Sequence, residues 1–198
     1  MIEGSPRSVE FGEEGRRLSY GGYLKIPELL QLQQLLSDPA AHDELLFIVV
    51  HQVFELWFKE LLWELEATRD ALDADLVARA RHYLARVHSI ERALVQQVEV
   101  LESMSPQDFL QFRTHLAPAS GFQSVQFREI EFISGLQDAR YLDRLTFDDQ
   151  EGVRLRRRLE ERTLWDAFCG LLDRHSLPMP ADDESARRQT LLRIARHR

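Results

Sequence analysis

The sequence predicts an all-α protein: a bundle of long antiparallel helices with an irregular N-terminal arm, forming a single domain. No glycine occurs between Gly22 and Gly121, and only four prolines interrupt that stretch. Glycine and proline are the strongest breakers of helices, so their scarcity over so long a segment favours helices over strands and turns. With 198 residues, 44% of them hydrophobic, the chain is long enough to bury one sizeable core.

Capping and breaking residues place the first helices. After an irregular arm over residues 1–25, a short helix is predicted over Pro27–Leu36, ended by a Ser-Asp-Pro break. The first long helix is predicted over Asp43–Leu72, with Asp43 as its N-cap. A second long helix is predicted over Asp75–Glu102.

The second half of the chain predicts shorter helices. Ser105, Pro106 and Asp108 supply a capping serine, a proline at the first helical position and an acid at the third. That helix is expected to end in the Leu-Ala-Pro-Ala-Ser-Gly turn. Further helices are predicted over residues 122–135, 151–175 and 184–198, so that the helical-bundle domain covers residues 26–198.

Composition excludes several classes of protein. The formal net charge of −8 argues against non-specific nucleic-acid binding, which needs a basic surface. No run of about 18 uncharged apolar residues occurs, so no membrane span is predicted, and the N-terminus lacks the apolar core of a secretory signal. A single cysteine, Cys169, excludes an internal disulfide and a multi-cysteine zinc site. A cytoplasmic location is therefore expected.

The run RLRRRLEER, residues 154–162, is rich in arginine. One interpretation is a patch that binds an anionic ligand. We favour a solvated helix face with ion pairs inside the helix, because mixed charges along one face are typical of an exposed helix.

One histidine lies within an apolar segment. On a helix, His51 shares a stripe with Phe47, Phe54, Phe58 and Leu62, spaced by four, three, seven and eleven residues. One interpretation is a core histidine whose ring nitrogens find partners nearby. The other is a pocket lined by Phe47 and capped by His51, because a histidine is costly to bury without partners and so apolar a helix offers few.

Phe109 and Arg113 are four residues apart and project from one face of a predicted helix. A planar guanidinium can hold a carboxylate through two parallel hydrogen bonds, with Phe109 as a wall of the site. The alternative is a surface arginine beside a core phenylalanine. Ser120, in the following turn, is expected to cap the next helix rather than to face a ligand.

Metal ligands are sparse in the sequence. Two-metal helical bundles use carboxylates together with Glu-x-x-His pairs, and no histidine here has a glutamate three residues before it. His51 and Glu55 form one isolated His-x-x-x-Glu pair, and His82 and His88 do not share a helix face. Non-haem metal chemistry is therefore not predicted.

Three separated segments occur in a recognisable order. They are YGGYL (Tyr20–Leu24), HDELLFIVVHQVFELWFKELLWEL (His42–Leu65) and FRTHLAPASGFQSVQFREIE (Phe112–Glu131). Together they resemble the haem-dependent tryptophan 2,3-dioxygenases, in register over residues 17–137 and more weakly around LWDAFCGLLDRH. The resemblance implies insertion of both atoms of O2 across the indole C2–C3 bond of L-tryptophan, giving N-formylkynurenine, with ferrous b-type haem binding the oxygen.

The resemblance also implies roles for single residues. His51 matches the histidine that contacts the indole N–H, and Phe47 the aromatic ring that packs on the indole. Arg113 matches the arginine that holds the substrate carboxylate, and Phe109 the aromatic residue one turn before it. The remaining matches are the substrate-side residues Ile48, Val49 and Val50, the haem-edge serine Ser120, and Tyr20 and Tyr23, arm tyrosines that in the family's homotetramer reach a neighbouring subunit's pocket.

The late part of the sequence departs from the family pattern. The family's iron is held by a histidine on a late helix, followed by a loop rich in glycine and serine, whereas the last glycine here is Gly170. Neither His175 nor His197 has the context of that ligand, so the sequence assigns no iron ligand. We therefore expect the substrate-side part of the fold without its haem-anchoring part.

Two alternatives to the dioxygenase stay open at this point. One is a truncated or diverged, non-catalytic helical protein that binds an indole or a porphyrin, or that only oligomerises. The other is a relative on the same scaffold that hydroxylates an aromatic amino acid.

Overall fold

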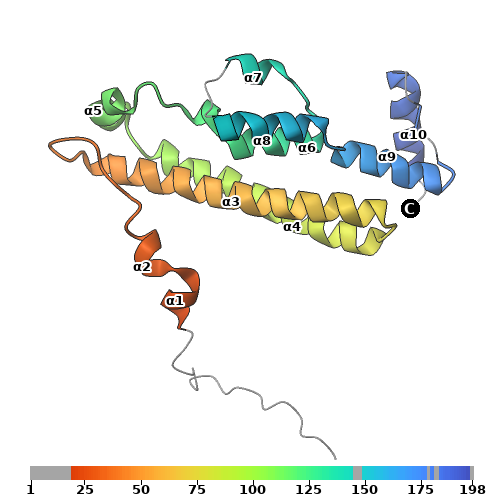
Figure 1. The fold of residues 1–198 in the computed structure, drawn as a ribbon, viewed down its shortest axis with the longest axis horizontal. Coiled ribbons are helices and arrows are strands. Elements are labelled where there is room, and N and C mark those ends of the chain that lie inside the picture. The colour runs from red at the N-terminus through yellow and green to blue at the C-terminus, as the bar shows by residue number, and fades with distance from the viewer. Residues whose placement is uncertain (1–18, 145–148, 178, 181–182, 197–198) are drawn as a thin grey trace, which may run out of the picture.

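The computed structural model describes residues 19–144, 149–177, 179–180 and 183–196. Within these ranges every regular element is a helix, which confirms the all-α prediction. Two long helices, α3 (His42–Asp73) and α4 (Val77–Glu102), run antiparallel and side by side along the molecule (Figure 1). Both predicted long helices are confirmed.

An apolar seam holds α3 against α4. Leu61 and Leu65 on α3 pack against Val87 and Ile90 on α4, and all four side chains are buried. Burying a side chain of this size contributes about 1.5–3 kcal/mol. The seam therefore fixes the position of α3, which is the helix that carries His51.

Three shorter helices complete the core: α6 (Val125–Ser134), α8 (Asp149–Glu160) and α9 (Leu164–Arg174). In Figure 1, α6 and α9 lie along α3, and α8 lies against α6. Ile133 on α6 joins the seam between α3 and α4. On its other side α6 packs Phe132 against Leu155 of α8, and both side chains are fully buried.

The prediction of one helix over residues 151–175 is wrong, because a capping box divides it into α8 and α9. The hydroxyl of Thr163 accepts a hydrogen bond from the Asp166 backbone N–H at 3.0 Å. In return the Asp166 carboxylate accepts one from the Thr163 backbone N–H at 2.9 Å. This reciprocal pair satisfies backbone donors that a new helix leaves without partners, so a second helix starts here.

The N-terminal prediction is only partly correct. Residues 1–18 of the predicted irregular arm lie outside the described residues, and Tyr20–Leu24 form the short helix α1 rather than irregular structure. The helix predicted over Pro27–Leu36 is limited to α2 (Ile26–Leu29). Asp43 is not an N-cap, because α3 begins at His42 and Ala41 occupies the cap position.

Residues 30–41, which we call the strap, are held along the start of α3 by polar contacts. Glu44 accepts hydrogen bonds from the backbone N–H groups of Leu36, at 2.7 Å, and Ser37, at 3.0 Å, and also from the Ser37 hydroxyl. Two turns further on, the Gln52 amide donates to the carbonyl of Leu32 at 3.2 Å. These bonds replace the helical bonds that residues 30–36 were predicted to make.

The remaining helices follow their caps. Ser105 caps α5 (Pro106–Leu116) by accepting a hydrogen bond from the Asp108 N–H at 3.2 Å, as predicted. A short 3-10 helix, η1 (Gly121–Gln123), precedes α6, and α7 (Arg140–Arg144) and α10 (Glu184–Arg196) lie later in the chain. None of the described helices is both long enough and apolar enough to cross a membrane.

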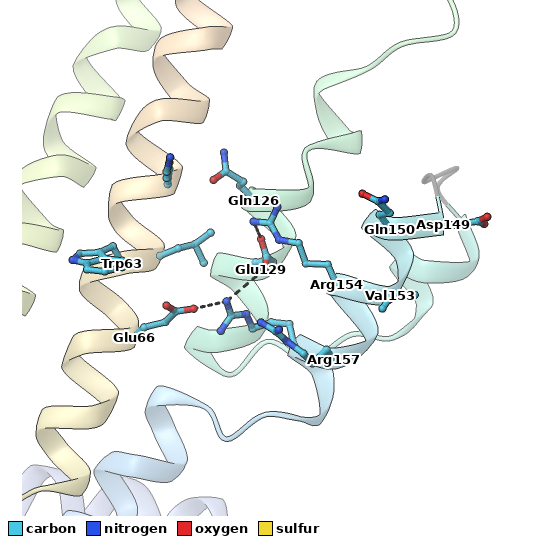
Figure 2. Close-up of a pocket in the computed structure, with 12 residues that line it drawn as sticks. Trp63, Glu66, Gln126, Glu129, Asp149, Gln150, Val153, Arg154 and Arg157 are labelled. Atoms are coloured by element: carbon cyan, nitrogen blue, oxygen red, sulfur yellow. Dashed lines mark hydrogen bonds and ion pairs between the residues drawn. The ribbon is translucent and has the colours of Figure 1, made fainter. Parts of the chain in front are cut away.

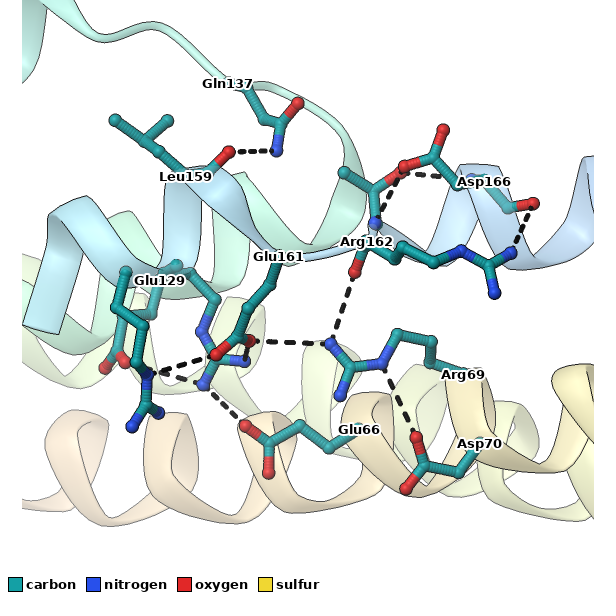
Figure 3. A network of polar contacts seen from close by, with 12 residues as sticks. Glu66, Arg69, Asp70, Glu129, Gln137, Leu159, Glu161, Arg162 and Asp166 are labelled. Atoms are coloured by element: carbon teal, nitrogen blue, oxygen red, sulfur yellow. Dashed lines mark hydrogen bonds and ion pairs between the residues drawn. The ribbon is translucent and has the colours of Figure 1, made fainter.

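A buried ion-pair network joins α3, α6 and α8 (Figure 3). The Arg158 side chain on α8 is 5% exposed, and it contacts Glu66 on α3 at 2.5 Å and Glu129 on α6 at 3.5 Å. Its guanidinium also donates to Glu161 at 2.7 Å. The prediction of a solvated arginine face therefore holds for Arg157, whose side chain is 70% exposed, and is wrong for Arg158.

Acidification is expected to weaken the anchoring of the strap. Burial raises the pKa of Glu44, but the hydrogen bonds from Ser37 and Leu36, with a smaller attraction to His115, outweigh burial and hold that pKa below its ordinary 4.5. A carboxylate with a lowered folded-state pKa adds stability above pH 4.5, and this is lost as the pH falls through the folded pKa. In urea unfolding we expect Glu44→Gln to lose about 1–3 kcal/mol at pH 7, and this deficit to shrink below pH 4.5.

The control for that measurement is Glu60→Gln, on the same helix. Among the described residues the Glu60 side chain makes no ion pair or hydrogen bond, so its substitution is expected to leave the unfolding midpoint nearly unchanged at every pH. A Glu44→Gln deficit that stayed constant from pH 7 to pH 3 would contradict the assigned role of the carboxylate.

Candidate active site

Side chains from α3 and α5 form an aromatic cluster. The ring centroid of Phe47 lies 4.0 Å from that of His51, 5.8 Å from that of Phe109 and 5.5 Å from that of Phe112. Phe112 is fully buried, and its ring meets Phe109 edge to face at 5.4 Å. The structure therefore brings Phe109 together with Phe47 and His51, which the sequence singled out as a separate pair.

Arg113 extends this cluster at its α5 end. Its guanidinium carbon lies 5.8 Å from the centroid of the Phe109 ring, within range of a cation–π contact. The residue is exposed, and no carboxylate among the described residues pairs with it. A continuous row in space thus runs from His51 through Phe47 and Phe109 to Arg113. The imidazole lies at one end, the guanidinium lies at the other, and the two aromatic rings lie between them.

The histidine is oriented by its own helix. Its Nδ1 lies 2.7 Å from the backbone carbonyl oxygen of Phe47. A carbonyl oxygen can only accept a hydrogen bond, so Nδ1 carries the proton, and in the neutral form of the ring the lone pair lies on Nε2. His51 is half-buried. It is therefore a core histidine with one satisfied nitrogen, and its other nitrogen is available as an acceptor.

A second aromatic row continues from His51 toward α6. Phe54, Phe58 and Phe127 follow one another with centroid separations of 6.1 and 5.6 Å. One turn beyond His51, the Gln126 amide donates to both the backbone carbonyl and the carboxylate of Glu55, each at 2.8 Å. Sequence reasoning missed this tie between α6 and α3. The available signal was Glu55 itself, a charged residue in an otherwise apolar stretch.

Other predicted residues do not join the cluster. Val50 is 2% exposed and belongs to the core, whereas Val49 is 40% exposed and Ile48 is half-buried. Consecutive residues on a helix point about 100° apart, so Phe47 to His51 cannot all face one site. Tyr20 and Tyr23 are exposed on α1, 77% and 69% respectively.

Ser120 is the cap that the sequence predicts. Its hydroxyl accepts a hydrogen bond from the Phe122 N–H at 3.3 Å, and its own N–H donates to the Gln123 side chain at 2.9 Å. Ser120 and Phe122 are both exposed. The haem-edge role implied for Ser120 stays a prediction.

The described residues hold no group of three His, Cys, Asp or Glu side chains close enough together to bind a metal ion. His175, one of the two late histidines, places its Nε2 3.3 Å from the Asp75 carboxylate. His197, the other, lies outside the described residues.

A separate cavity of about 710 Å³ opens between α3, α6 and α8 (Figure 2). Glu66, Glu129, Arg154 and Arg158 lie along it, and Arg154 pairs with Glu129 there. None of the residues predicted to bind substrate lines this cavity. It is therefore a feature of the ion-pair network and not of the aromatic cluster.

Comparison with known proteins decides the family. The family model described as Tryptophan 2,3-dioxygenase matches residues 5–181. A protein of that name from a Nocardioides species is 55% identical over 98% of this chain. The chain belongs to the tryptophan 2,3-dioxygenase family. The resemblance that the three sequence segments predict is therefore confirmed.

Further relatives in the tryptophan 2,3-dioxygenase family are 45% identical. The match to the Xanthomonas oryzae protein covers 82% of this chain, and the match to the Herpetosiphon aurantiacus protein covers 83%. The chain spans 55% and 63% of the lengths of these two relatives, and 73% of the Nocardioides protein. Tryptophan 2,3-dioxygenases are generally haem-dependent.

Proposed function

We propose that the protein inserts both atoms of O2 across the C2–C3 bond of the indole ring of L-tryptophan, in a haem-dependent reaction that gives N-formylkynurenine. One observation carries the proposal: the row from His51 through Phe47 and Phe109 to Arg113. Its two polar ends complement the indole N–H and the carboxylate of tryptophan, and its middle complements the flat apolar ring. The names of the relatives support the same reaction.

Each end of the row has a distinct task. An indole N–H that is removed from water needs an acceptor, and the bare Nε2 of neutral His51 supplies one. A carboxylate beside an apolar surface needs a cation, and Arg113 has no carboxylate partner of its own among the described residues. Phe47 packs on the indole between these two groups. The substrate is thereby held in one orientation.

Ser120 and Phe122 are the residues of this chain that would hold haem in this proposal. Ser120 offers a hydroxyl and Phe122, which is 73% exposed, offers an uncovered aromatic ring, and these two groups suit the edge of a porphyrin. Bound b-type haem supplies the ferrous iron that activates O2. The residues of this chain bind and orient the indole and exclude water from it.

The proposed assembly is a cytoplasmic homotetramer in which the arm of one subunit reaches its neighbour. Tyr20 and Tyr23 support this, because both are large, exposed side chains on α1, which lies away from the bundle in Figure 1. In the proposed tetramer a neighbouring subunit would cover both rings. The molecular mass in solution tests the assembly.

The test of the function is a turnover experiment with labelled oxygen. The protein is supplied with haem, a reductant, L-tryptophan and ¹⁸O2, and the molecular mass of the product is measured by mass spectrometry. N-formylkynurenine carrying two labelled atoms is the expected result. A hydroxylated tyrosine formed from L-tyrosine would favour the hydroxylase on the same scaffold. A folded, helical protein that gives no product from either amino acid would favour the non-catalytic alternative.

The role of His51 gives a separate prediction. His51→Ala is expected to weaken L-tryptophan binding about tenfold, the contribution of one buried hydrogen bond, and to change the binding of 1-methyl-tryptophan little, because that analogue lacks the N–H. Calorimetry with both ligands measures the difference, and His88→Ala on the exposed face of α4 is the matched control. An equal loss for both ligands would show that His51 acts by packing alone.

A further inference from the structure

We propose that Glu44 is a positioning residue: it holds the strap against α3 and so sets one side wall of the aromatic site and the point at which α1 leaves the bundle. The inference rests on the proposed function for the identity of the site. It adds a residue that touches neither the substrate nor haem in that proposal.

The strap is docked by polar contacts and not by apolar burial. Its leucines point outward: Leu32 is 61% exposed, Leu35 40% and Leu36 62%. By contrast Ser37 is buried, and its hydroxyl both donates to Glu44 and accepts from the Ala41 N–H at 2.8 Å. A segment that buries so few of its apolar side chains depends on its hydrogen bonds for its position.

Glu44 is an unusual residue for such a task. It is 1% exposed, although an ionised carboxylate is costly to bury. Three hydrogen bonds from the strap compensate, two from backbone N–H groups and one from Ser37. His115 on α5 adds a favourable electrostatic interaction. The carboxylate therefore lies where the strap, α3 and α5 meet.

Helix geometry relates this junction to the aromatic site. Glu44 precedes His51 by two turns and lies within about 20° of the same line along α3. Phe47, about 40° to one side of His51, is covered by Phe109 and Phe112 of α5. Gln52, about 100° to the other side, holds the strap through Leu32. His51 thus lies between α5 and the strap.

A second contact keeps the strap in register. The Gln33 amide donates to the Gln52 side chain at 2.5 Å and to the backbone carbonyl of Leu29 at 3.1 Å. The strap is therefore fixed at both ends, by Glu44 near its C-terminal end and by Gln52 near its N-terminal end. Between these points the strap cannot slide along α3 without breaking several hydrogen bonds. These bonds therefore fix the point at which α1 leaves the bundle.

Hydrogen exchange and steady-state kinetics on the full chain test the proposal. Glu44→Gln places an amide donor against strap N–H donors, and Ser37→Ala removes the bridging hydroxyl. In both variants we expect the exchange rates of amides of residues 30–41 to rise at least tenfold more than those of α4 amides, which report only the loss of global stability. We also expect the KM for L-tryptophan to rise at least fivefold while kcat stays within threefold. Glu60→Gln is the control and should match the wild type in both measurements.

Each other outcome overturns a definite part of the proposal. Unchanged exchange in the strap would remove Glu44 as its anchor, and an equal rise in exchange rate in the strap, α3 and α4 would reduce Glu44 to a general stabilising residue. Local loosening without a change in KM would show that the strap is not a wall of the site. A wild-type protein without turnover would refute the proposed function, and the exchange measurement would still decide whether Glu44 holds the strap.

Discussion

Replacing Arg158 with alanine is expected to lower the free energy of unfolding by about 3–5 kcal/mol, the range for removing one partner of a buried ion pair. Burial lowers the pKa of Arg158, but the hydrogen bond to Glu66 and the attraction of Glu161 and Glu129 more than offset this and raise it. The guanidinium is therefore charged, and its loss leaves Glu129, which is 1% exposed, with Arg154 as its remaining ion-pair partner. Urea unfolding at pH 7 measures the change.

Arg157→Ala is the matched control for that substitution. Arg157 neighbours Arg158 on α8, but its side chain is 70% exposed, and among the described residues it pairs only with Glu161, at 3.1 Å. Exposed ion pairs contribute about 0–1 kcal/mol. If the two variants lost similar stability, the buried network would contribute no more than a surface pair, and its role in holding α8 on α3 would be wrong.

Arg113→Ala is expected to produce the second large effect, on ligand binding rather than on stability. Removing the cation that faces a desolvated carboxylate typically costs about 2–5 kcal/mol, which corresponds to a loss of about 30-fold to several thousand-fold in L-tryptophan affinity. Because Arg113 is exposed and makes no ion pair within the described residues, the fold itself should be unaffected. Calorimetric titration measures the affinity, and thermal unfolding checks the fold.

Two comparisons make the Arg113 prediction specific. Tryptamine lacks the carboxylate, so its weaker binding should be the same in the wild type and in Arg113→Ala. Arg79→Ala, an exposed arginine on α4 with no ion-pair partner among the described residues, should bind L-tryptophan as the wild type does. An Arg113→Ala variant that retained wild-type affinity for L-tryptophan would remove this residue from the site.

The fold could be predicted where one strong pattern acts alone. The long helices α3 and α4 follow from an apolar repeat that no glycine interrupts, and α5 follows from the cap made by Ser105. Prediction of the strap failed because contacts distant in the sequence decide its conformation. Residues 30–36 have helix-forming side chains, yet Glu44 and Gln52 hold them in another conformation. Local propensity could not show this, because both partners lie beyond the segment.

The site could likewise be predicted within each helix but not between helices. Spacing placed Phe109 and Arg113 on one helix face, and His51 on one face with Phe47, but no pattern within one helix could bring the two faces together. The packing of Phe112 between them does so. Arg158 was misjudged for a related reason: its sequence neighbours are charged, and the carboxylates that bury it come from other helices.

The Nδ1–H of His51 donates a hydrogen bond to the backbone carbonyl of Phe47. The main chain of α3 therefore determines the tautomer of the ring. A histidine that must present one particular nitrogen can also be oriented by a carboxylate, which a single substitution can delete and which makes the ring more basic. Here the acceptor is a backbone carbonyl, which no side-chain substitution removes as long as this turn of helix is intact. The residues around His51 can therefore vary in evolution while the same ring nitrogen stays available to a ligand.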